Sequence, residues 1–181
     1  MAREDTQRVY DELLVTLARA GDRKAANRLA TRWYPRLMRT ALRLTRDRAE
    51  AEEAVQEAWA GICRGWPRLS DPAMFPGWAF GILRRKCADR IRTAVKRRGR
   101  EAPMDAAPDI SQPARGELQV EIDQALASLS DDHRLAAILF FGEGLSLTEI
   151  AAVTGVPVGT AKSRIFNARK HLKSSLKGDP Q

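Results

Sequence analysis

Basic and polar side chains gather between Thr160 and Lys177, a segment that contains no acidic residue. Apolar residues recur there at intervals of three and four, which predicts a helix with one buried stripe. The predicted polar stripe is Thr160, Ser163, Arg164, Asn167 and His171, flanked by Lys162, Arg169, Lys170, Lys173 and Lys177. Guanidinium and carboxamide groups suit guanine and adenine edges, and lysines suit phosphates. The segment therefore has the chemistry of a DNA-reading helix.

The residues before this helix predict how it is positioned. Ser146 and Glu149 have the spacing of a capping box, in which the serine oxygen accepts from the glutamate amide and the glutamate reaches back. Gly155 suits a left-handed turn, and Pro157 is tolerated in the first turn of the helix that follows. This order predicts a helix-turn-helix whose second helix enters the major groove. The alternative is a solvated basic face on an ordinary helix, and the turn chemistry favours DNA binding.

A second cluster is acidic and lies on a helix predicted over residues 47–65. Its members are Glu52, Glu53, Gln56 and Glu57. Like charges at a spacing of four cost a few tenths of a kcal/mol. In a strongly basic chain such a face would repel DNA, so it suits a protein partner with a basic surface. A solvated helix face is the alternative interpretation.

A third cluster combines aromatic and basic side chains. Trp78 and Phe80 precede a segment, 84–100, that holds nine Lys or Arg residues and one acid, Asp89. Rings can stack on unpaired bases while cations follow the phosphate backbone, so the segment suits single-stranded DNA. The candidate contacts are Trp78, Phe80, Arg84, Arg85, Lys86, Arg90 and Arg92. The alternative gives much of the area of Trp78 and Phe80 to the core, since the two rings cannot both be fully exposed without cost.

Other chemistries find little support in the sequence. His133 and His171 have no evident nucleophile or metal partner, and no glycine-rich phosphate loop is present. Cys63 and Cys87 lie inside helical patterns, which predicts two ordinary buried thiols. We therefore expect no catalysis by the chain itself, no metal and no cofactor.

Composition agrees with a polyanionic partner. The chain has 181 residues, a formal net charge of +8 and a pI of about 10.1. Such a charge draws a protein to nucleic acid or to an anionic membrane. The N-terminal residues lack the apolar core of a signal peptide, and no apolar run approaches the roughly 18 residues of a membrane span. We expect a soluble cytoplasmic protein.

Strand signals are almost absent, and the apolar spacing predicts an all-α fold of two small helical domains. Three prolines and two glycines within 99–116 forbid a continuous helix there, which predicts a flexible linker. The predicted domains are 1–98 and 117–177. Helices are expected over 6–20, 23–44, 47–65 and 75–95, and then over 117–129, 131–141, 147–154 and 158–176. Pro35 is expected to kink or interrupt the second helix.

These features in this order resemble the extracytoplasmic-function (ECF) sigma factors of the sigma-70 family. The resemblance covers nearly the whole chain outside the linker and the extreme ends. It rests on residues 47–57 (DRAEAEEAVQE), 75–80 (FPGWAF), 89–92 (DRIR) and 156–164 (VPVGTAKSR).

The resemblance implies a role for each cluster. The acidic helix would bind the β′ clamp helices of core RNA polymerase, and the second domain would meet the β flap. The segment from Trp78 to Arg92, with the loop before it, would open and hold the promoter −10 element. The helix 158–176 would recognise the −35 element, and an anti-sigma factor would occlude these surfaces. Arg85 stands where many relatives have asparagine, so the base contacts of Arg85 and Lys86 are not carried over.

Two alternatives remain open at this point. A stand-alone helix-turn-helix regulator explains the C-terminal segment, although it leaves the acidic cluster and the aromatic segment without a role. A sigma mimic that only sequesters an anti-sigma factor is disfavoured, because both DNA-facing helices retain their basic residues.

Overall fold

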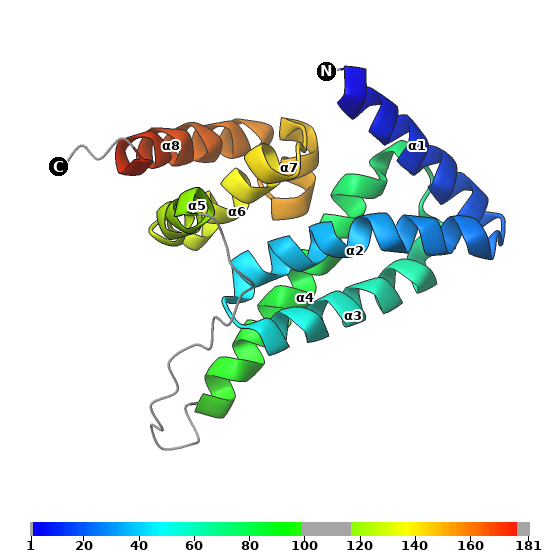
Figure 1. The fold of residues 1–181 in the computed structure, drawn as a ribbon, viewed down its shortest axis with the longest axis horizontal. Helices are drawn as coiled ribbons and strands as arrows, with labels where there is room; N and C mark the ends of the chain where they lie inside the picture. Colours follow the sequence, from blue (N-terminus) through cyan, green and yellow to red (C-terminus); the bar gives the residue numbers. More distant parts are fainter. Residues whose placement is uncertain (1, 99–116, 177–181) are drawn as a thin grey trace.

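A computed structural model describes residues 2–98 and 117–176 (Figure 1). Every regular element within these two ranges is helical, so the predicted all-α fold is confirmed. The segment 99–116, which the sequence predicts to be a linker, lies outside the described residues.

Four helices form an N-terminal group. They are α1 (Ala2–Arg19), α2 (Arg23–Thr45), α3 (Arg48–Gly65) and α4 (Phe75–Arg98), and two short 3-10 turns, Trp66–Arg68 and Pro72–Met74, join α3 to α4. Aspartates begin two of the helices, because the side chain of Asp22 accepts from the amides of Lys24 and Ala25, and that of Asp47 accepts from Glu50. These bonds satisfy amides that have no partner within the helix.

The helix α2 continues through Pro35, so the predicted interruption does not occur. A proline inside a helix removes one hydrogen bond and costs about 3 kcal/mol. On the same helix, Leu29, Trp33 and Leu37 are completely buried. Each buried side chain of this size contributes about 1.5–3 kcal/mol, so packing outweighs the cost of the proline.

A C-terminal group follows. It comprises α5 (Glu117–Ala127), α6 (Asp131–Ala137), a π-helical turn (Ile138–Gly142), α7 (Leu147–Thr154) and α8 (Val158–Leu176). The sequence predicts one regular helix over 131–141, whereas its last turn is widened to π geometry. This widening leaves Ile138 and Leu139 buried while Phe140 and Phe141 are exposed.

Arg134 joins α6 to the end of α5 and the turn after it. Its buried guanidinium donates to the carbonyl of Leu126 at 3.0 Å and to that of Leu129 at 2.7 Å, and it pairs with Asp131 at 2.9 Å. The end of a helix leaves carbonyls without partners, and this one side chain satisfies those at the end of α5. Burial lowers the pKa of Arg134, although arginine keeps its charge in proteins.

The two groups pack side by side, with α7 against α4 and the second half of α5 near the end of α2 (Figure 1). One hydrophobic cluster runs through both groups. It joins Leu37 and Phe75 of the N-terminal group to Leu139, Ile150 and Val153 of the C-terminal group. The described molecule is therefore closed, with the two groups sharing one core.

The cysteine prediction is half correct. Cys87 is buried, and burial raises the pKa of its thiol to about 12. Cys63 is exposed, contrary to expectation, because it lies on the outer side of α3.

Among the described helices, none is long and apolar enough to cross a membrane.

Candidate nucleic-acid and protein interfaces

The helix α8 presents a basic face to solvent. Its buried stripe is Ala161, Ile165 and Ala168, as the spacing predicts. The candidates Lys162, Ser163, Asn167, Arg169 and Lys170 are exposed, and Thr160 is half-buried. The exposed side chains can therefore approach a polyanion without rearrangement of the helix.

Two members of the predicted polar stripe instead turn toward neighbouring helices. Arg164 forms a short ion pair with Asp132 at the start of α6, and only 21% of its side chain is exposed. The Nε2 atom of His171 lies 2.9 Å from the hydroxyl of Ser128. Arg164 must leave Asp132 before it can contact a base, and His171 lies at the junction with α5.

Phe166 is an aromatic residue outside the set predicted from the sequence. It is 67% exposed. It lies four residues after Lys162 and four before Lys170, on the side of α8 away from the buried stripe. This position relative to the two lysines could have revealed it, because residues at i and i+4 share a face. An apolar ring in a basic face has the chemistry to contact a thymine methyl group.

The preceding turn holds α8 in place. Both bonds of the predicted capping box are present, since the Glu149 amide donates to Ser146 Oγ at 3.2 Å and the Ser146 amide donates to Glu149 Oε2 at 2.7 Å. Gly155 ends α7 with φ of +72°, the left-handed conformation that glycine adopts without cost. The predicted helix-turn-helix is therefore present.

The acidic face of α3 divides into two parts. Glu53 and Gln56 are exposed and form no hydrogen bond or ion pair with any described residue. Glu52 pairs with Arg48 one turn earlier, at 2.9 Å. Glu53 and Gln56 are therefore the members of this face that can bind another protein without loss of an internal contact.

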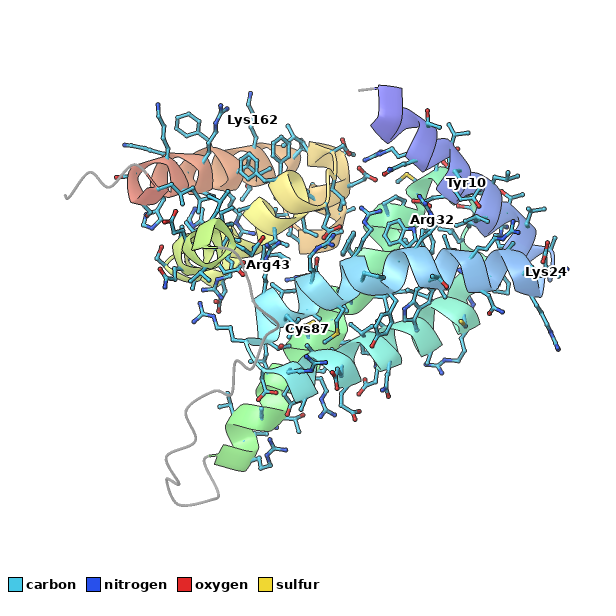
Figure 2. The ribbon with its side chains drawn as sticks, in the orientation of Figure 1. Tyr10, Lys24, Arg32, Arg43, Cys87 and Lys162 are labelled. Atoms are coloured by element: carbon cyan, nitrogen blue, oxygen red, sulfur yellow. The ribbon has the colours of Figure 1, made fainter. Side chains whose placement is uncertain are left out.

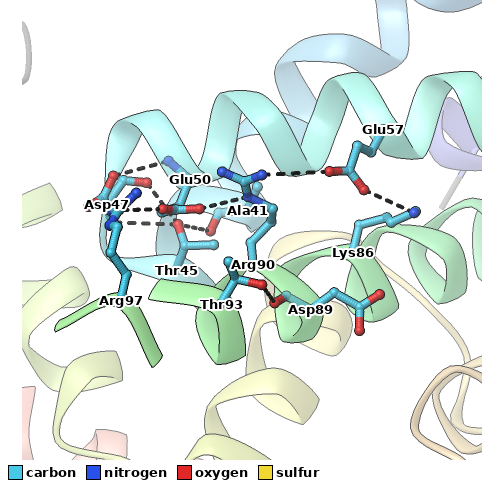
Figure 3. A network of polar contacts seen from close by, with 10 residues as sticks. All are labelled: Ala41, Thr45, Asp47, Glu50, Glu57, Lys86, Asp89, Arg90, Thr93 and Arg97. Carbon is cyan, nitrogen blue, oxygen red and sulfur yellow. Dashed lines mark hydrogen bonds and ion pairs between the residues drawn. The ribbon is translucent and has the colours of Figure 1, made fainter. Parts of the chain in front are cut away.

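Glu57 instead takes part in a network that joins α3 to α4 (Figure 3). Its carboxylate lies 2.9 Å from Lys86 and 3.8 Å from Arg90. Arg90 also pairs at 2.7 Å with the buried Glu50, which Arg97 approaches to 3.5 Å. The hydrogen bond to Glu50, with the nearby carboxylates, raises the pKa of Arg90. Lys86 and Arg90, both predicted to contact DNA, thus already have carboxylate partners.

Phe80 does not belong to an accessible face. It is 1% exposed, and its ring centroid lies 5.7 Å from that of Trp33. It packs inside the N-terminal group, so its predicted stacking on DNA is wrong for this fold. Trp78 is half-buried, and its ring lies over Gly65, where an added Cβ would come within 2.6 Å of it. Part of Trp78 remains accessible.

The other basic candidates on α4 differ in surroundings. Arg85 is exposed, and Arg92 is exposed while pairing with Asp89 one turn earlier. Arg84 is half-buried and donates to the carbonyl of Val153 in α7 at 3.2 Å.

Within the described residues, no group of three or more His, Cys, Asp or Glu side chains could hold a metal ion.

Two family models match the chain on either side of the segment 99–116. Sigma-70 region 2 matches residues 29–97, and sigma-70 region 4 matches residues 119–172. The ECF RNA polymerase sigma factor SigM of Mycobacterium tuberculosis is 32% identical over 158 residues, which cover 87% of this chain and 80% of SigM. The chain belongs to the ECF sigma factors of the sigma-70 family.

Other sigma factors are also similar to this chain. The sigma-E factor of Escherichia coli K12 is 28% identical over 94% of this chain and 96% of its own. The sigma factor RpoE of Bartonella quintana, solved in complex with the anti-sigma factor NepR, superposes with a TM-score of 0.70 at 28% identity. That match covers 87% of this chain and 99% of RpoE. Sigma factors of this family bind core RNA polymerase and promoter DNA in transcription initiation.

Proposed function

We propose that this sigma factor divides its work among three surfaces on two domains. Residues 1–98 form the domain for core polymerase and the −10 element, 117–177 form the domain for the −35 element, and 99–116 connect them. The observation that carries this assignment is one of charge. Between Ala49 and Cys63, α3 carries acidic residues and no basic one, whereas α8 carries exposed Lys and Arg residues and no acidic one.

On α3 the proposed polymerase contacts are Glu53 and Gln56, supported at the edge by Glu52 and Glu57. An acidic face on a basic protein disfavours DNA and suits a basic protein surface, here the β′ clamp helices. The C-terminal domain would meet the β flap. The chain supplies binding only, and polymerisation belongs to the polymerase. Because the factor acts on that polymerase, it acts in the cytoplasm.

The −10 surface comprises the accessible part of Trp78 with Arg84, Arg85 and Arg92. Lys86 and Arg90 join it only after leaving Glu57 and Glu50. The aromatic edge can contact an unstacked base, while the cations follow the phosphates.

The −35 surface is the outer face of α8. Phe166 adds to the residues predicted from sequence, which are Thr160, Lys162, Ser163, Arg164, Asn167, Arg169 and Lys170. The lysines would neutralise phosphates, while Asn167 and Phe166 would contact base edges.

Control by an anti-sigma factor is part of the proposal. It is supported by RpoE of Bartonella quintana, whose structure contains the anti-sigma factor NepR. We infer that a protein of this class covers the proposed surfaces on α3, α4 and α8 here.

Binding to purified core RNA polymerase tests the assignment. The double variant Glu53→Arg with Gln56→Arg should bind core polymerase at least about tenfold more weakly, because two cations then face a basic partner. Neither side chain forms an internal hydrogen bond or ion pair with a described residue, so the far-ultraviolet circular dichroism should not change. Glu121→Arg on α5 is the control, because it reverses the charge of an exposed acid outside this face.

If the folded parent fails to bind core polymerase while α8 still binds duplex DNA, the chain acts as a stand-alone helix-turn-helix regulator. If the double variant binds as well as the parent, the polymerase surface lies elsewhere than on α3.

A further inference from the structure

A row of arginines on α2 faces the C-terminal group. Arg36, Arg39 and Arg43 follow one another at spacings of three and four, which places them on one face of the helix, and Arg46 follows directly after its end. The guanidinium of Arg36 is held over the ring of Trp33, 4.1 Å from its centroid. Figure 2 shows Arg43 where α2 approaches the C-terminal group. The arginine row therefore lies against the C-terminal group.

Glu143 is the main partner of this row. It follows the π-helical turn, and only 1% of its side chain is exposed. Its carboxylate accepts from Arg36 Nε at 2.9 Å and from Thr40 Oγ1 at 3.2 Å, and Arg39 lies 3.7 Å away. All three partners belong to α2. These contacts therefore exist only while the two groups are closed, and breaking one of them with the groups still closed would leave a buried charge poorly paired.

Two further arginines extend the contact. Arg43 pairs with Asp123 of α5 at 3.1 Å, and Arg46 donates to the carbonyl of Ala127 at 2.9 Å. Arg46 has φ of +57°, a left-handed conformation that usually falls to glycine or asparagine at the end of a helix. The chain therefore tolerates backbone strain at the position from which this side chain reaches the C-terminal group.

Closure also covers part of α4. An added Cβ at Gly77 would lie 3.3 Å from the Cβ of Glu149, and Arg84, two turns later, donates to Val153. Arg8 of α1 ties down the same region, since it donates to the carbonyl of Gly144 at 2.8 Å and lies 3.3 Å from Glu149. The outer face of α8, by contrast, stays exposed.

We propose that Glu143 is the latch of an autoinhibited closed form, in which it binds the arginine row of α2 and holds α7 over the start of α4. The proposal rests on the proposed function for the role of α4. Opening separates the groups and uncovers Arg84 for the −10 strand.

Size supports the need for opening. Promoter elements centred about 25 base pairs apart are separated by roughly 85 Å at 3.4 Å per base pair. A compact chain of 181 residues has a radius of gyration of about 16 Å and hence a diameter of about 40 Å. The closed molecule cannot reach both elements on straight DNA.

Small-angle X-ray scattering of the full chain tests the latch without polymerase or promoter. Glu143→Arg places a cation against Arg36 and Arg39 and should raise the ratio of open to closed molecules at least about tenfold. We expect the radius of gyration to increase by several ångströms. The control Glu121→Arg should scatter like the parent.

A second pair keeps the test decisive if Glu143→Arg fails to fold. Asp123→Arg acts at a half-buried pair and should also open the molecule, whereas the charge swap Arg43→Asp with Asp123→Arg should close it again. If these variants are as helical as the parent and all have its radius of gyration, the latch is wrong.

Fluorescence anisotropy with a labelled 12-nucleotide oligo(dT) tests the masking of α4. The opened variants should bind this strand at least about fivefold more tightly than Glu121→Arg, and Arg84→Ala should remove much of that gain. If the molecules open and the affinity does not rise, closure does not mask a DNA surface. If they open and bind the strand but not core polymerase, the latch stands and the proposed sigma role fails.

Discussion

Phe166 tests the −35 surface at the scale of one residue. Because it is 67% exposed, Phe166→Ala should change the free energy of unfolding by no more than about 0.5 kcal/mol. Loss of an apolar base contact should weaken binding to a selected −35 duplex by about 1–3 kcal/mol. Titration of the duplex by anisotropy measures this, with Leu176→Ala, an exposed apolar residue at the far end of α8, as the control. Equal affinities for both variants would remove Phe166 from the surface.

At the same scale, the sequence predicts which helix a charged residue belongs to but not its partner. The basic face of α8 follows from spacing alone, because a helix sets the direction of each side chain. The pairs Arg164–Asp132 and Lys86–Glu57 join different helices. They depend on how those helices cross, which spacing within one helix does not contain. Phe80 was misassigned for the same reason, since only the packed group shows it against Trp33.

The junction of α3 and α4 gives a prediction at the scale of elements. Gly65→Ala would bring a Cβ within 2.6 Å of the Trp78 ring, so the ring must move. Overpacking costs about 1–3 kcal/mol, and alanine returns at most about 1 kcal/mol of helix propensity. We expect a net loss of up to about 2 kcal/mol by urea unfolding. We also expect weaker opening of the −10 region, as measured by permanganate reactivity of unpaired thymines.

Gly61→Ala on the same helix is the matched control. Its added Cβ would meet only the Cγ2 methyl of Ile82, at 3.2 Å, which a small shift can accommodate. The change should be neutral or slightly stabilising and should leave promoter opening intact. Equal losses in both variants would show that α3 requires glycine for another reason and that Trp78 is not positioned by Gly65.

Helix ends were predictable where a local signal marks them. Ser146, Asp47 and Asp22 each cap a helix close to where the sequence places its start. The continuity of α2 through Pro35 was not predictable from the proline, because it depends on how deeply Trp33 and Leu37 are buried. The π-helical turn after Ala137 also escaped prediction, since its hydrogen bonding departs from the regular helical period.

The whole molecule shows an arrangement that the sequence left undecided. The contact between Arg36 and Glu143 joins residues 107 positions apart, and no local sequence pattern predicts that they form a pair. Helical periodicity predicts which faces are apolar, but it does not say which group covers which. The closed form is defined by two features of the tertiary structure, the shared core and the contacts of the arginine row.

A reversible cross-link tests closure at this scale. The Cβ of Glu149 lies 3.3 Å from the Cβ that a side chain at Gly77 would have, close to the 3.5–4.5 Å of disulfides. Gly77→Cys with Glu149→Cys, in a Cys63→Ser background, should therefore form a disulfide between the two groups. Cys87 should not interfere, because burial raises the pKa of its thiol to about 12 and keeps it protonated at pH 8.

Oxidised, this variant should retain the α3 face and bind core polymerase, because Glu53 and Gln56 lie away from the cross-link. It should direct transcription from a cognate promoter at least about tenfold less than the same protein after dithiothreitol, since a locked molecule about 40 Å across cannot span both elements. The single variant Gly77→Cys controls for the effect of the reductant and for loss of the glycine. Equal transcription by the oxidised and reduced forms, with the cross-link verified by mass spectrometry, would mean that promoter recognition does not require the two groups to separate.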